Sequence, residues 1–184
     1  AEFITDARAK PGQLTFATVG PATTQHIGFE QFKRVANIGV IYVPYPGGAP
    51  AMTALLGGHV HAVLANYSEV QEQLQAGKVR ALASTSQTRI APLPDVPSVA
   101  ELGYKNYNVE VWFGVMAPAK TPKVIVDQLS RELKKAVNDP KFAERMKAQG
   151  LETVGSTPES MLTSVVLSVV ACISTLSSLL LVSV

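Results

Sequence analysis

Cysteine and charge are the scarcest features of this 184-residue sequence. The single cysteine, Cys172, excludes an intramolecular disulfide framework and a cysteine-based zinc site. Charged residues make up only 16% of the chain, and their net charge of +2 is too balanced for a nucleic-acid-binding surface. Hydrophobic residues make up 47%, so the chain can bury a core and is not disordered by composition.

The motifs of several common activities are also missing. There is no GxGxxG and no GK[ST], which argues against dinucleotide and P-loop nucleotide binding. His59 and His61 lie two residues apart at a strand start, but no HExxH motif or carboxylate cluster supplies a third ligand, so we expect no metal and no cofactor. Small-hydrolase activity is an alternative in which His26, Ser84 and Asp95 would form a triad, but there is no GxSxG elbow.

The last part of the chain carries no charge at all from Met161 to Val184. Its length would allow it to span a bilayer. Its many Ser and Thr residues, and its lack of an aromatic belt or a basic flank on the far side, favour a buried helix or an altered end instead.

Short apolar runs alternate with helical patterns through the first half of the chain, which indicates βαβ units and a mainly parallel sheet. After an extended, proline-rich connection at 91–97, a short helix, a further strand and three helices are expected. Each of those three helices follows an N-cap residue paired with proline, at Thr121-Pro122, Asp139-Pro140 and Thr157-Pro158. The predicted strands are 14–18, 40–43, 60–64, 79–83 and 109–116, and the earlier helices are 22–36, 50–56, 66–76 and 98–102.

Three turns from strand to helix share one design. Each has small residues or an N-cap where a helix begins, and free backbone N–H groups there can hold a carboxylate without Lys or Arg. In parallel units all three turns lie at the carboxyl edge of the sheet, where open α/β sheets bind ligands. A purely structural role for any single turn remains the alternative. In the third turn, Asn66 with Glu69 three residues later predicts a capping box. The candidate ligand-binding residues are Thr18, Gly20, Thr23, Thr24 and His26 in the first turn, Tyr45, Gly47 and Gly48 in the second, and Asn66 in the third.

Several segments taken together resemble one family, the periplasmic solute-binding receptors of tripartite tricarboxylate transporters, or Bug receptors. The resemblance is collinear over about residues 1–162. The segments that carry it are 10–17, 20–26, 43–51, 56–58, 76–83, 93–101, 112–114, 117–118, 121–122 and 154–159.

The resemblance implies an α/β fold of the type II periplasmic-binding-protein kind, with one complete lobe and part of the other. Residues 1–11 would end a first-lobe helix, 12–110 would form the second, ligand-binding lobe, 111–162 would return to the first lobe, and 163–184 would be an atypical apolar tail. Such receptors are periplasmic and are not enzymes. They close over a small organic carboxylate and deliver it to membrane permease subunits.

This sequence also departs from the family pattern. Ala65 stands where the family usually has an acidic residue, which favours a plain carboxylate or a neutral ligand end. The family's N-terminal part with its signal peptide is not in this chain, and a lobe without its first strands should expose apolar surface. The alternative of another class is a ligand-sensing effector domain of a regulator with the same fold.

Overall fold

The computed structural model describes residues 2–161 and 178–183. Its centre is a five-stranded sheet in the order β2-β1-β3-β5-β4. The strands are β1 (Thr15–Val19), β2 (Ile41–Tyr45), β3 (Ala62–Asn66), β4 (Val79–Ser84) and β5 (Ser178–Ser183). The strand β1 pairs in parallel with both β2 and β3, whereas β5 runs antiparallel between β3 and β4. The predicted α/β class and the four early strands are confirmed.

Helices cover both faces of this sheet. They are α1 (Glu2–Ala9), α2 (Thr24–Ala36), α3 (Gly48–Leu56) and α4 (Tyr67–Gln75). Because successive strand side chains point to opposite faces, Phe16 packs on the side of α1 and α2 while Ala17 packs on the side of α3 and α4. On β3, Leu64 and Val63 divide between the two clusters in the same way. The sheet is therefore the middle layer of three.

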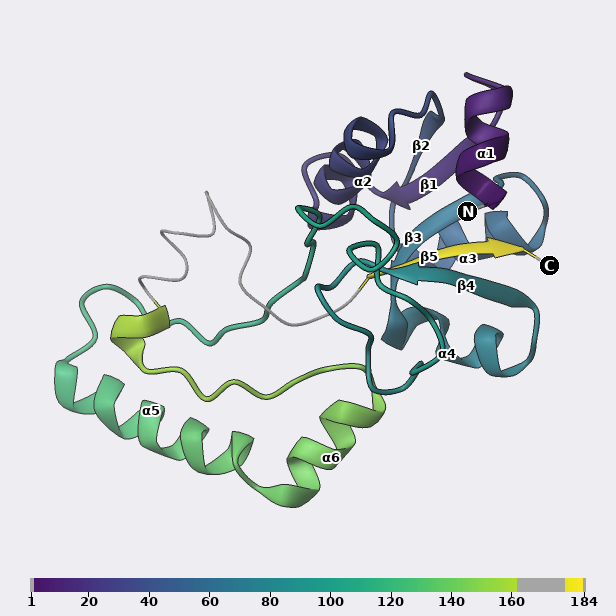
Figure 1. The fold of residues 1–184 in the computed structure, drawn as a ribbon. Helices are drawn as coiled ribbons and strands as arrows, with labels where there is room; N and C mark the ends of the chain where they lie inside the picture. Colours follow the sequence, from purple (N-terminus) through teal and green to yellow (C-terminus); the bar gives the residue numbers. More distant parts are fainter. Residues whose placement is uncertain (1, 162–177, 184) are drawn as a thin grey trace.

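Two further helices, α5 (Lys123–Val137) and α6 (Pro140–Ala148), lie away from the sheet (Figure 1). Asp139 caps α6 by accepting a hydrogen bond from the Phe142 amide at 2.9 Å, and Pro140 begins the helix as predicted. The expected N-cap at Thr121 is wrong by one residue, because Pro122 occupies the cap and the helix starts at Lys123. No residue of either helix is buried.

Three other sequence predictions are wrong. The predicted strand 109–116 is reduced to a single bridge residue at Glu110, and residues 111–118 are assigned to no strand, because a strand needs a neighbour with which its backbone pairs. Residues 98–102 form turns in which the Leu102 amide donates to the Ser98 carbonyl, and Ser98 instead bridges Ser84. In the tail, 178–183 is strand β5 rather than helix, since its backbone pairs with both β3 and β4.

The bilayer-spanning alternative for the tail depends mainly on residues 162–177. These residues lie outside the part of the chain that the structure describes. Within the part of the chain that the structure describes, no helix has the length and hydropathy needed to cross a bilayer.

Candidate functional site

The three predicted turns meet at one edge of the sheet. Val19 at the end of β1 is in register with Tyr45 at the end of β2, and β3 ends beside them at Asn66. The Gln25 side chain in the first turn of α2 donates to the Asn66 side chain at 3.2 Å. This buried hydrogen bond joins residues that are 41 positions apart in the sequence and fixes the start of α2 against the start of α4.

The first turn is built around the cap of α2. The Thr23 hydroxyl accepts from the His26 amide at 3.2 Å and lies 2.9 Å from the Gly20 carbonyl, to which it donates. Ala22 has a φ of +64°, a left-handed conformation that costs about 1 kcal/mol for a residue with a Cβ. Such strain is typical of turns that are constrained by their surroundings or by function.

The polar side chains of this turn differ in how free they are. Thr18 is fully buried, and its hydroxyl donates to the Val19 carbonyl at 2.6 Å. Thr24 is half-buried, and its hydroxyl has no partner within the described ranges 2–161 and 178–183. Thr23 is occupied by its capping role, so Thr24 is the better placed of the two threonines to bind a ligand.

His26 is held in a defined orientation. Its ring stacks on that of Tyr42 with centroids 4.4 Å apart, and its Nδ1 accepts from the Ala22 amide at 3.3 Å. In the neutral imidazole the proton then lies on Nε2, which leaves that nitrogen as a hydrogen-bond donor.

The second and third turns are in contact with each other. Asn66 and Glu69 form a capping box at the start of α4, as the sequence predicts, with the Asn66 amide donating to Glu69 Oε2 at 3.0 Å. A Cβ added at Gly48 would lie 2.6 Å from Glu69 Oε2. The glycine at position 48 therefore lets the α3 terminus approach Glu69, a residue that sequence reasoning assigned only to the cap. At Gly20 and Gly47 an added Cβ would make only ordinary contacts.

Neither alternative chemistry is assembled by the described residues. Ser84 is fully buried and lies 3.5 Å from the Thr88 carbonyl oxygen, whereas His26 packs on Tyr42. His61 Nδ1 accepts from the Thr15 amide at 3.1 Å. Among the residues that the structure describes, no group of three or more His, Cys, Asp and Glu side chains is arranged to hold a metal.

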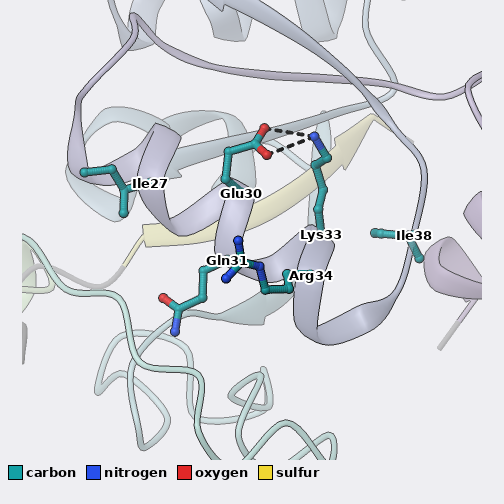
Figure 2. A pocket seen from close by; sticks show the side chains of 6 residues that line it. All are labelled: Ile27, Glu30, Gln31, Lys33, Arg34 and Ile38. Carbon is teal, nitrogen blue, oxygen red and sulfur yellow. Dashed lines mark hydrogen bonds and ion pairs between the residues drawn. The ribbon is translucent and has the colours of Figure 1, made fainter.

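A separate hollow lies along one face of α2 (Figure 2), where Lys33 and Glu30 form a salt bridge at 2.9 Å. None of the nine predicted ligand-binding residues contributes to it. Its lining residues are Ile27, Glu30, Gln31, Lys33, Arg34 and Ile38.

Comparison with known proteins identifies the family. The sequence profile described as "Tripartite tricarboxylate transporter family receptor" matches residues 1–163. The chain belongs to this receptor family. It is 36% identical over 157 residues to protein BugT of Bordetella pertussis, covering 85% of this chain and 48% of BugT. It is also 36% identical over 159 residues to a UPF0065 protein from the tcbD-tcbE intergenic region of Pseudomonas sp. strain P51, covering 86% and 47%.

Solved structures of receptors of this kind share the fold. Rpa4515 of R. palustris, solved with adipate, superposes with a TM-score of 0.86 at 31% identity, over 92% of this chain and 56% of that one. The periplasmic binding protein BugD superposes with a TM-score of 0.77 at 33% identity, over 91% and 57%. MatC of Rhodopseudomonas palustris, solved with malate, gives 0.70 at 25% identity, over 86% and 53%. These likenesses confirm the type II periplasmic-binding-protein class, and the chain spans about half the length of the curated relatives it matches.

Proposed function

We propose that this chain is the ligand-binding part of a periplasmic receptor that captures a small organic carboxylate between two lobes and delivers it to the permease subunits of a tripartite tricarboxylate transporter. In this proposal residues 12–110 form the ligand-binding lobe, and residues 1–11 and 111–162 belong to the other lobe. The protein acts by binding and closure rather than by catalysis.

The observation that carries the proposal is the meeting of three helix starts at one sheet edge. The starts of α2, α3 and α4 present backbone N–H groups there, and Gln25, Asn66 and Glu69 join them. Helix starts attract anions without a Lys or Arg side chain, and the carboxyl edge of parallel strands is where such folds bind ligands. Family relatives solved with adipate and malate support a carboxylate as the ligand.

Each predicted residue has a role in this proposal. The Thr24 hydroxyl and His26 Nε2 donate to the carboxylate, and backbone N–H groups near Gly20, Gly47 and Gly48 line the site. Thr18, Thr23 and Asn66 hold the turns in place through their internal hydrogen bonds. Tyr45 is half-buried at the end of β2 and offers its ring and hydroxyl to the ligand.

A thermal-shift screen of this chain against di- and tricarboxylates and aromatic acids tests the proposal. A ligand that binds only the folded state raises the melting temperature as its concentration increases. We expect Thr24→Ala to weaken binding of the best acid by about tenfold or more, because a hydrogen bond to a charged group is lost. Thr53 supplies the matched control, since its hydroxyl donates to the Ala49 carbonyl within α3.

Thr23→Ala tests whether binding depends on the α2 cap. We expect it to lower the free energy of unfolding by about 1 kcal/mol through loss of the α2 cap, and to weaken binding because the turn loosens. Thr23→Ser keeps the capping oxygen and should preserve both. Equal affinities of the Thr24→Ala and Thr53→Ala variants for the acid would contradict a role for the first turn in binding. The absence of a melting-temperature shift with any acid would count against carboxylate binding by this chain.

A further inference from the structure

The three helix starts have one carboxylate among them in the described contacts, that of Glu69. It comes from the first turn of α4, and its Oε2 accepts from the Asn66 amide at 3.0 Å. The same carboxylate lies against the first residue of α3, where a Cβ at position 48 would come within 2.6 Å of Oε2 and would displace the Glu69 side chain. Glu69 thus contacts two of the three helix starts at once.

This contact makes the edge electrically uneven. Each helix start carries roughly half a positive charge, so one carboxylate offsets about as much charge as the starts of α3 and α4 supply together. The first turn of α2 contains no acidic residue, and its cap is the neutral Thr23. The favourable position for an anion is therefore near α2, and a second anion near α3 and α4 would face the Glu69 charge.

We propose that Glu69 is a specificity-determining residue, which selects ligands with a single carboxylate, bound near α2, and an uncharged opposite end. This inference rests on the proposed function, because it presumes that the edge of the sheet binds a carboxylate. Glu69 does not create the site but raises the cost of a second negative charge within it.

Two six-carbon acids test this directly. Hexanoate carries one carboxylate and adipate carries two, at the same chain length. In Glu69→Gln the amide oxygen can still accept from the Asn66 amide, so the capping box and the fold are retained. We expect this variant to bind adipate about tenfold more tightly than the unsubstituted chain does, with hexanoate affinity changed less than about twofold. The gain should shrink at 1 M salt, where the Debye length falls to about 3 Å.

Glu72→Gln is the matched control. Like Glu69, Glu72 is exposed, but it lies about one turn further along α4, away from the helix starts. Binding is measured by titration calorimetry on the full chain, and melting temperatures check that each variant is folded. An equal gain for adipate in both variants, or an unchanged adipate-to-hexanoate ratio in Glu69→Gln, would overturn the role of Glu69 while leaving carboxylate binding intact. Failure of both acids to bind any variant would instead overturn the proposed function, and this inference with it.

Discussion

Two regions of this chain contain helices with apolar stripes, yet the two regions bury those stripes to very different extents. In α2, Phe29 is fully buried and Phe32 is 4% exposed. In α5, Leu129 is 46% exposed and Leu133 41%, although Ile125, Leu129, Leu133 and Val137 recur every fourth residue. An amphipathic pattern therefore identifies the face that a helix would bury, but the burial itself depends on a partner element.

The contrast in burial extends over residues 2–161. Among residues 2–161, the buried hydrophobic residues lie within 7–109, on both faces of the sheet and in the segments that close over it. Residues 110–161 contain extended apolar segments with Phe113 at 76% and Met116 at 69% exposure. The relatives are about twice as long as this chain, so their additional length is where a covering partner for this second region would be sought.

The largest expected effect compares truncations in the two regions. Phe29→Ala should lower the free energy of unfolding by about 3–5 kcal/mol, because Phe29 stacks on Phe16 at 4.2 Å and its loss leaves a cavity. Leu129→Ala should change it by less than about 0.5 kcal/mol, because Leu129 is already half in solvent. Urea denaturation measures both. Similar losses would mean that α5 is covered in solution.

A second prediction probes how tightly the sheet region is packed. A Cβ at Gly28 would lie 2.6 Å from Val109 Cγ1, so Gly28→Ala should cost about 1–3 kcal/mol even though alanine favours helix. Val109→Ala removes the clashing methyl groups. The double variant should therefore be more stable than the sum of the two single losses predicts, and strict additivity would argue against this contact.

Much of the sheet region could be predicted from the sequence because its units are local. Strand, turn and helix follow one another within about 30 residues, and the caps at Asn66 and Asp139 can be recognised from side-chain type alone. The meeting of the three turns was predictable from the rule that parallel strands share an edge. The contact of Glu69 with Gly48 was not, because it depends on how α3 and α4 pack.

The errors fall where structure depends on distant partners. Residues 109–116 have strand composition, but within the described ranges only Glu110 forms a bridge. Residues 178–183 pair with β3 and β4, which lie more than 90 positions earlier in the chain. Composition records neither relationship. For the candidate site, residue type indicated donors, but only the structure separates the capping Thr23 from Thr24, whose hydroxyl has no partner among the described residues.

Tyr107 provides a third prediction, at the boundary between the two regions. Its buried hydroxyl donates to the Gly28 carbonyl at 3.1 Å, and burial raises its pKa well above the usual value of 10.0. The folded state therefore disfavours the phenolate, so stability is full below pH 10 and falls as pH rises above it. Tyr107→Phe should cost about 1 kcal/mol at pH 7 and should flatten the alkaline decline. Parallel alkaline curves for the two proteins would contradict this assignment.

The smallest effects come from one exposed ion pair in each region, and they have opposite signs with pH. The pKa of Glu101 is lowered, first by the hydrogen bond from the Ser98 amide and then by Arg89. The Glu101 carboxylate therefore stabilises the folded state above the ordinary carboxyl pKa range, and this stabilisation is lost as pH falls through the lowered value. Asp127 Oδ1 lies 2.7 Å from Lys123 Nζ and raises the pKa of Lys123. The stabilisation from this pair is therefore present below pH 10.5 and is lost as pH rises further.

Amide NMR can follow the two pairs separately, because each is local. We expect the Ser98 amide resonance to titrate with acid in the unsubstituted chain but not in Glu101→Gln, since this amide donates to Glu101 Oε2 at 3.0 Å. The first turn of α5 should respond to base, and that response should be lost in Asp127→Asn. The Glu101 pair joins segments of the packed region, whereas Lys123 and Asp127 lie within one helix. Glu101→Gln should therefore shift neighbouring amide resonances across 84–102, whereas the shifts in Asp127→Asn should remain confined to α5. Equally local shifts at both sites would weaken the distinction between the two regions.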